Sequence, residues 1–149
     1  MKIAIGCDHG GFVLKPAALA AVERQGAEAV DFGTYDESSC DYPVFALKVA
    51  EAVASGEAEL GILLCGTGIG ISIAANKVKG IRAACVTNPF MAAATREHNN
   101  ANIIALGGRV VSPEQAGEIL DAFLSASFQG GRHQRRVDLI SEIEDKYFK

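Results

Sequence analysis

The sequence predicts an α/β fold with an open, mainly parallel sheet of five strands and helices on both faces. Two observations support this prediction. Short apolar runs alternate five times with alanine-rich amphipathic stretches, and glycine-containing loops separate the two kinds of segment. One run, Leu60 to Leu64, is almost continuously apolar, as expected of a central parallel strand that is covered on both faces. Such alternation is typical of parallel sheets, because each strand needs a crossover segment to reach the next strand in the same direction.

The predicted strands are the five apolar runs, in chain order Lys2 to Cys7, Glu28 to Phe32, Leu60 to Leu64, Ile81 to Val86 and Asn102 to Leu106. The predicted helices are Phe12 to Gln25, Pro43 to Ala54, the segment after Gly70 through Asn76, Pro89 to Glu97, Pro113 to Ala126 and residues 132–148. Gly26 ends the first helix, Pro43 opens the second, and Ser112 caps the fifth. Pro16 falls inside the first helix, so we expect a distorted first turn there. With no linker, repeat or low-complexity segment, residues 1–149 are expected to form one Rossmann-like domain with a charged C-terminal helix.

Composition and charge exclude several classes of protein. The chain has 14 basic and 18 acidic residues, a formal net charge of −4, so nonspecific binding to nucleic acid is not expected. No apolar run approaches the roughly 20 residues that cross a bilayer. The first six residues are too short and too regular for a signal peptide, so we expect a soluble, cytoplasmic protein with no membrane partner. The four cysteines form no C-x-x-C pair and no zinc-like spacing, so neither a disulfide framework nor a metal site is expected.

In open α/β sheets, ligands bind outside the carboxyl ends of the strands, near the point where the strand order reverses. The candidate site residues are therefore the polar or glycine-rich ones that follow the predicted strands and their helices, namely Asp8, His9, Cys65 to Gly70, His98, Asn99 and Arg109. The third histidine, His133, lies among the glycines and arginines of residues 130–136. A single histidine outside the core of a helix or strand is more often a surface residue than a catalyst. Three of them beside glycines, arginines or asparagines favour a functional site.

The segment Cys65-Gly66-Thr67-Gly68-Ile69-Gly70 joins a predicted strand to a predicted helix. Its glycines permit positive φ and close backbone approach, so successive N–H groups can converge on an anion. The spacing matches neither a Walker loop nor the dinucleotide fingerprint, and a simple packing turn is the alternative. Cys65 favours chemistry, because a thiol that faces backbone donors gains nucleophile or base character. The other possibility for Cys65 is a buried apolar filler.

Three arginines, Arg132, Arg135 and Arg136, fall in the first turns of the last predicted helix. Positive charge there opposes the helix macrodipole, and Arg132 with Arg136 is a like-charge pair four residues apart. Both effects are unfavourable, so the arrangement indicates an anion between the arginines, and forked guanidinium groups suit a phosphate dianion. The alternative is a solvated basic face that pairs with nearby acidic residues, namely Asp138, Glu142, Glu144 and Asp145. That alternative explains Arg135 better than the other two.

Six segments acquire a common meaning when they are taken together and in order. They are Gly6-Cys7-Asp8-His9-Gly10-Gly11, Asp41-Tyr42-Pro43, Cys65 to Gly70, Arg96-Glu97-His98-Asn99, Gly108-Arg109-Val110 and Gly130-Gly131-Arg132-His133-x-x-Arg136. With these segments the chain resembles, over essentially its whole length, the B-type ribose-5-phosphate isomerases and the wider family that includes galactose-6-phosphate and allose-6-phosphate isomerases. The resemblance implies a Rossmann-like domain that pairs as a homodimer, or forms a tetramer, with active sites built from both chains. It also implies a metal-independent aldose–ketose isomerase without a cofactor, acting on ribose 5-phosphate and ribulose 5-phosphate through an enediolate, in the pentose phosphate pathway.

The resemblance further implies a role for each matching residue. Cys65, which places the chain in the cysteine branch of the family, would be the general base that takes the C2 proton. Thr67 and His98 would assist opening of the furanose ring, with His98 as the proton donor. The backbone amides of Gly66, Thr67, Gly68, Ile69 and Gly70 would stabilise the enediolate oxygens. The remaining substrate contacts would come from Asp8, His9, Tyr42, Asn99, Arg109, Arg132 and Arg136, with the arginines holding the phosphate.

Two other functions stay open. An isomerase for allose or galactose 6-phosphate needs only slightly more pocket length, which the sequence does not measure. A regulatory module that binds a phosphate or a nucleotide without chemistry could use the same loops, although such a module needs no thiol at position 65. A metalloenzyme is disfavoured, because no carboxylate–histidine constellation has ligand spacing.

Overall fold

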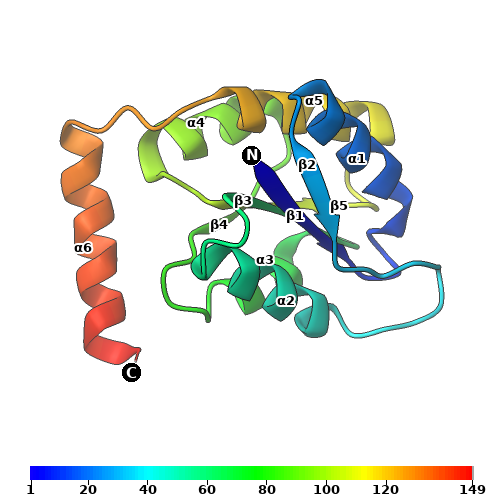
Figure 1. Ribbon diagram of the computed structural model, residues 1–149, viewed down its shortest axis with the longest axis horizontal. Coiled ribbons are helices and arrows are strands. Elements are labelled where there is room, and N and C mark those ends of the chain that lie inside the picture. The colour runs from blue at the N-terminus through cyan, green and yellow to red at the C-terminus, as the bar shows by residue number, and fades with distance from the viewer. Residues whose placement is uncertain (149) are drawn as a thin grey trace.

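Five strands form one sheet in the order β2-β1-β3-β5-β4 (Figure 1). The structure is a computed structural model and describes residues 1–148. The strands are β1 (Lys2–Cys7), β2 (Glu28–Asp31), β3 (Leu60–Cys65), β4 (Ala83–Cys85) and β5 (Ile103–Gly107). Each pairing is parallel, so the predicted sheet is confirmed and is parallel throughout. After β2 the chain crosses to the other side of β1 to form β3, so the strand order reverses between β1 and β3.

Helices cover both faces of the sheet, as predicted. In chain order they are a 3₁₀ turn η1 (Phe12–Leu14) followed by α1 (Lys15–Arg24), α2 (Tyr42–Ala54), α3 (Ile69–Ala75), α4 (Pro89–Asn99), α5 (Pro113–Ser125) and α6 (Arg132–Tyr147). Helices α1, α4 and α5 pack together over one face, and α2 and α3 pack over the other (Figure 1). Helix α6 lies at the left of Figure 1 and contacts α4. Within residues 1–148, no helix is both long enough and apolar enough to cross a membrane.

Each face of the sheet has its own hydrophobic cluster. The cluster under α1, α4 and α5 contains large, fully buried side chains such as Phe123. The cluster under α2 and α3 is richer in alanine, and α2 lies close to the sheet there. Gly6 and Gly61 permit this approach, because a Cβ atom at either position would come within 2.8 or 2.7 Å of a Val49 methyl group. A crossover helix runs antiparallel to its strands, so α2 begins, with Tyr42, at the carboxyl edge of the sheet.

Local capping signals explain most of the observed helix boundaries. Pro16 lies in the first turn of α1, after the separate 3₁₀ turn, where its missing N–H group has no intrahelical partner to lose. The expected distortion is therefore confirmed. The predicted cap of α5 is also confirmed, because Ser112 Oγ accepts the N–H of Gln115 at 3.1 Å and Gln115 Oε1 accepts the N–H of Ser112 at 2.8 Å. The fourth strand is shorter than predicted, since the N–H of Arg82 donates to the side chain of Asn102 at 2.8 Å.

Candidate active site

A pocket of about 280 Å³ opens at the carboxyl edge of the sheet, where the strand order reverses. Its lining comes from the turn after β1, the start of α2, the loop between β3 and α3, and the turn after β5. The lining residues are Asp8, His9, Gly10, Tyr42, Cys65, Gly66, Thr67, Gly70 and Arg109. Eight of the predicted site residues are therefore brought together, and only Gly10 was absent from the predicted set. Its signal was present in the sequence, in the glycine pair that follows His9.

Strand β3 ends at Cys65, one residue later than the predicted strand, and only 4% of Cys65 is exposed. Its sulfur accepts the N–H of Gly68 at 3.1 Å. Gly68 can fold back toward the sulfur because its φ is +83°, in the region that favours glycine. A donor aimed at the sulfur stabilises a thiolate more than a thiol. Cys65 is thus buried in the core cluster and also lines the pocket.

Asp8 organises the turn that follows β1. Its Oδ1 accepts the N–H groups of Gly10 and Gly11 at 2.9 and 3.0 Å, and only 6% of the residue is exposed. The turn presses against β3, since a Cβ atom at Gly11 would lie 2.2 Å from the carbonyl group of Leu64. Asp8 therefore has a structural role in addition to the substrate contact that the sequence predicts.

Tyr42 and Arg109 form walls of the pocket by lying against glycines of the β3–α3 loop. A Cβ atom at Gly70 would come within 2.7 Å of the Tyr42 ring, and one at Gly66 would come within 2.8 Å of the Arg109 guanidinium group. The backbone N–H of Arg109 also donates to the carbonyl of Gly66 at 2.9 Å. Tyr42 and Arg109 thus occupy the volume that a side chain at Gly70 or Gly66 would need.

Six predicted site residues do not line this pocket in the single chain: Gly68, Ile69, His98, Asn99, Arg132 and Arg136. We expected His98 outside the helices, and this is wrong, because α4 extends to Asn99 and places His98 in its last turn. The helix ends at Asn100, whose φ of +48° is left-handed. His133 lies in the first turn of α6, inside the helix predicted over residues 132–148, and its ring stacks on that of His98 with centroids 4.3 Å apart.

The arginines at the start of α6 are exposed and have no acidic partner within residues 1–148. Of the four acidic residues offered as partners, Asp145 pairs with Lys79 at 2.9 Å, Glu144 accepts the N–H of Gly80 at 3.0 Å, and Asp138 accepts from Gln134 at 2.7 Å. The acids that this alternative offered as partners are therefore not ion-paired with the arginines among the described residues, although the arginines are exposed, as a solvated basic face would be. Arg132 and Arg136 keep their forked donors available for an external anion.

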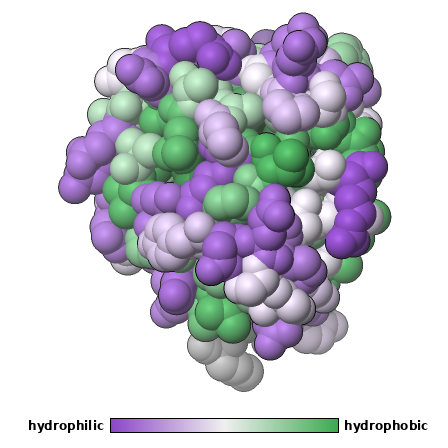
Figure 2. Space-filling view, turned by 90° about the vertical axis from the view of Figure 1, so that its right-hand side faces the viewer, coloured by the Kyte–Doolittle hydropathy of each residue, from purple (hydrophilic) through white to green (hydrophobic). Residues whose placement is uncertain are grey.

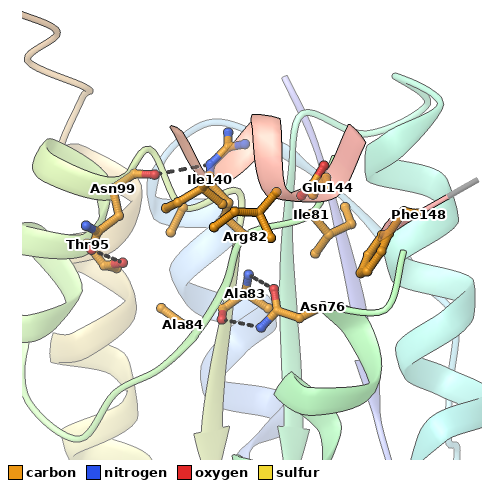
Figure 3. A pocket seen from close by; sticks show the side chains of 12 residues that line it. Asn76, Ile81, Arg82, Ala83, Ala84, Thr95, Asn99, Ile140, Glu144 and Phe148 are labelled. Carbon is orange, nitrogen blue, oxygen red and sulfur yellow. Dashed lines mark hydrogen bonds between the residues drawn. The ribbon is translucent and has the colours of Figure 1, made fainter. Parts of the chain in front are cut away.

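A second cavity, of about 400 Å³, lies between β4 and α6 (Figure 3). Arg82 crosses it and donates from Nε to the carbonyl oxygen of Asn99 at 3.1 Å, and Ile140 and Phe148 come from the C-terminal region. The side chain of Asn76 covers the outer edge of β4, where it donates to the carbonyl of Ala83 at 2.9 Å and accepts its N–H at 2.8 Å. This cavity contains no thiol or histidine. Within residues 1–148, no three histidine, cysteine or carboxylate side chains gather as metal ligands would.

Comparison with known proteins identifies the family. A family model described as Ribose/Galactose Isomerase matches residues 3–140. The chain is 52% identical over 145 residues to ribose-5-phosphate isomerase B of Escherichia coli, with 97% of each chain covered. The solved structure of Clostridium thermocellum ribose-5-phosphate isomerase B is 60% identical and superposes with a TM-score of 0.96, covering 99% of both chains. A Mycoplasma genitalium ribose-5-phosphate isomerase B with bound ribulose-5-phosphate is 44% identical, with a TM-score of 0.91 and 97% coverage of both. The chain belongs to the ribose/galactose isomerase family.

Proposed function

We propose that this protein is a metal-independent isomerase that interconverts ribose 5-phosphate and ribulose 5-phosphate, with Cys65 as the general base. The observation that carries the proposal is the position of Cys65, in a pocket that it shares with His9, Asp8 and Arg109. The relatives named above act on, or hold, a pentose phosphate, and this supports a five-carbon substrate over a hexose phosphate. A binding module would need no sulfur at this position.

In the proposed reaction the Cys65 thiolate removes the proton from C2 of the open-chain aldose. The C2–H bonding pair forms a C1=C2 double bond, and the aldehyde oxygen receives the electrons of the C1=O π bond, which gives an enediolate. The protonated sulfur then returns the proton to C1, while a proton moves from O2 to O1, and the product is the ketose. The Gly68 N–H donates to the sulfur that carries the base role in this proposal. Backbone N–H groups of the 66–70 loop are the donors that we assign to the developing oxygen charge.

The phosphate end of the substrate is assigned to Arg109 and His9 within the chain and to Arg132 and Arg136 of a second copy. The two α6 arginines do not line the Cys65 pocket of their own chain, yet they have no acidic partner among the described residues. A remote phosphate clamp supplies binding energy that holds C2 against the base. In this proposal His98 of the second copy is the proton donor for ring opening, and Asn99 accompanies it.

An exposed stripe on α6 supports the assignment to a homodimer. Leu139, Ile143 and Tyr147 lie four residues apart, so they share one helix face, and they are 47%, 61% and 68% exposed. By contrast, on the side of the molecule at the right of Figure 1, hydrophilic side chains interrupt the hydrophobic patches (Figure 2). A stripe of large apolar residues is the kind of surface that a second copy covers, in a dimer or as part of a tetramer.

The proposal is tested by comparing Cys65→Ala with a matched thiol variant, Cys85→Ala. Cys85 ends β4 and its sulfur lies 3.7 Å from the carbonyl oxygen of Thr67, but it does not line the pocket. We expect Cys65→Ala to lower kcat by about 10²–10⁴-fold, the usual contribution of a general base, with little change in substrate affinity. We expect Cys85→Ala to keep most of the activity. Isomerisation by Cys65→Ala at the wild-type rate would show that the mechanism is wrong.

The substrate is tested separately, by turnover of ribose 5-phosphate and allose 6-phosphate. We expect the larger kcat/KM for the pentose phosphate. A preference of about tenfold or more for the hexose phosphate, or about 1.4 kcal/mol in transition-state stabilisation, would replace this assignment with the hexose alternative.

A further inference from the structure

The segment of residues 33–41, which we call the strap, leads from β2 to α2 and comes beside the pocket at its end. It continues the pairing with β1 beyond the end of the sheet, because the N–H of Cys7 donates to the carbonyl of Gly33 at 2.6 Å and the N–H of Thr34 donates back to Cys7 at 2.6 Å. The strap ends at Asp41, immediately before Tyr42 of the pocket wall. Two side chains outside the strap fix it at separate points.

Lys15 is the first fixed point. This residue is only 6% exposed, and its Nζ lies 2.7 Å from Asp31 Oδ2 and donates to the carbonyl oxygen of Thr34. The ammonium group also lies 4.5 Å from the ring centroid of Tyr35, whose hydroxyl donates to the backbone carbonyl of Asp31 at 3.0 Å. A buried lysine is stable only with such partners, so the start of the strap depends on Lys15.

His9 is the second fixed point. The backbone N–H of Cys40 donates to His9 Nδ1 at 3.2 Å, and the Cys40 sulfur lies 4.0 Å from the same nitrogen. A backbone N–H can only donate, so Nδ1 must present a lone pair. A neutral imidazole carries one proton, which is then on Nε2. In a doubly protonated ring, Nδ1–H of His9 would face the N–H of Cys40, and neither group could accept a hydrogen bond from the other.

We infer that the strap selects the tautomer of His9: the Cys40 amide holds Nδ1 as an acceptor, Lys15 anchors the strap that carries this amide, and His9 presents Nε2–H to the pocket. His9 therefore acts as a neutral hydrogen-bond donor to a substrate oxygen. The negative charge of the phosphate is left to the guanidinium groups. The assignment of Lys15 and Cys40 as positioning residues rests on the proposed function for its effect on substrate, but the tautomer itself does not.

Long-range ¹H–¹⁵N correlation spectra of the ¹⁵N-histidine-labelled full chain report the tautomer directly. The His9 signals are assigned as those that are missing from the spectrum of His9→Gln. We expect the proton on Nε2 in the wild type and in Cys40→Ala, which removes the thiol but keeps the amide. We expect a mixture of both tautomers in Cys40→Pro, which removes the N–H. A proton on Nδ1 in the wild type overturns the inference, whether or not the proline variant folds normally, and so does an unchanged spectrum in a folded Cys40→Pro.

Lys15 is tested by Lys15→Met, with Lys15→Arg as the conservative variant. We expect Lys15→Met to shift the His9 spectrum toward the tautomer mixture of Cys40→Pro, and Lys15→Arg to restore the wild-type spectrum. If Lys15→Met is too unstable, Lys15→Met/Asp31→Leu removes the whole ion pair and gives the same readout. A wild-type His9 spectrum in folded Lys15→Met, or in folded Lys15→Met/Asp31→Leu, overturns the role of Lys15.

Substitutions of His9 test the consequence for substrate. A glutamine amide nitrogen falls near the place of Nε2, and an asparagine nitrogen near that of Nδ1. We expect His9→Asn to raise KM for ribose 5-phosphate by about 3- to 10-fold, as for loss of one neutral hydrogen bond, and His9→Gln to raise it clearly less. Equal KM values for the two variants overturn the donor role. If the protein does not isomerise the pentose phosphate at all, the proposed function fails while the tautomer result stands.

Discussion

The imidazole rings of His98 and His133 stack, with their centroids 4.3 Å apart and their planes 15° from parallel. His98 is in the last turn of α4 and His133 is in the first turn of α6, so the stack joins the C-terminal helix to the rest of the domain. Burial lowers the pKa of His133 below its ordinary value of 6.5, and the positive charges of His98, Arg132 and Arg136 lower this pKa further. The folded protein therefore favours a neutral His133.

A pH dependence of stability follows from this lowered pKa. The unfolded chain binds the proton more readily than the folded one, so the stability from the neutral ring is complete above pH 6.5 and is lost as the pH falls below that value. Urea unfolding at about pH 7.5 and about pH 5.5 measures the loss. We expect a larger loss for the wild type than for His133→Phe, which keeps a ring but cannot titrate. Equal losses in the two proteins would contradict the role of His133.

Sharing of the active site between chains is tested by subunit mixing. We expect Arg136→Ala to raise KM by about 10- to 100-fold through loss of a charge-assisted phosphate contact, and Arg135→Ala, the matched control one residue away, to change it little. Mixing inactive Cys65→Ala with Arg136→Ala under exchanging conditions should then restore about a quarter of the wild-type activity at low substrate, because half of the dimers are mixed and each has one intact site. No recovery from verified mixed dimers would place both residues in the same site of one chain.

Gly70 is expected to affect activity more than stability. The Cβ atom of Gly70→Ala would meet the far end of the Tyr42 ring at 2.7 Å, and this side chain can swing away without unfolding α2. We expect KM to rise several-fold while the melting temperature stays nearly constant, and Tyr42→Leu in the same chain to relieve the clash. Gly117→Ala in α5 is the control, since its Cβ meets only Arg24 at an ordinary 3.5 Å. An unchanged KM for Gly70→Ala would show that the Tyr42 wall does not contact substrate.

Two substitutions of Asp8 distinguish its structural role in the turn after β1 from its predicted contact with the substrate. Asp8→Asn keeps an Oδ1 that can accept the N–H groups of Gly10 and Gly11, whereas Asp8→Ala removes it. We expect Asp8→Ala to lose about 1–3 kcal/mol of unfolding free energy and Asp8→Asn to lose much less. Both should bind the sugar more weakly if the carboxylate contacts it. Calorimetry and steady-state kinetics on the same samples distinguish the two roles, and equal stabilities for both variants would remove the structural one.

Sequence patterns correctly identified features that depend on residues close together in the chain. Ser112 with Gln115 forms the capping box at its expected place, and Cys65 comes at the end of a strand that is apolar almost throughout. The contact between Cys40 and His9 left no such signal, because it joins two irregular segments 31 residues apart. The predicted end of α4 was wrong for a related reason. The carbonyl groups of Asn99 and Asn100, at the end of the helix, accept from Arg82, which precedes the helix in the chain.

The location of the phosphate clamp also depends on information that a single chain does not carry. Arg132 and Arg136 oppose their own helix dipole, which indicates an anion, but the pattern does not say which pocket holds that anion. The structure places them away from the Cys65 pocket of the same chain. We propose that a second copy completes the site because of that separation, and the family resemblance implies the same arrangement.

A crystal structure of the protein with ribose 5-phosphate or ribulose 5-phosphate bound would show whether the sugar lies against Cys65. We expect C2 of the open-chain sugar within about 3.5 Å of Cys65 Sγ, the distance of a near-attack geometry, with the phosphate against guanidinium groups. A sugar phosphate bound away from this sulfur, for example in the cavity beside Arg82 and Ile140, would contradict the account.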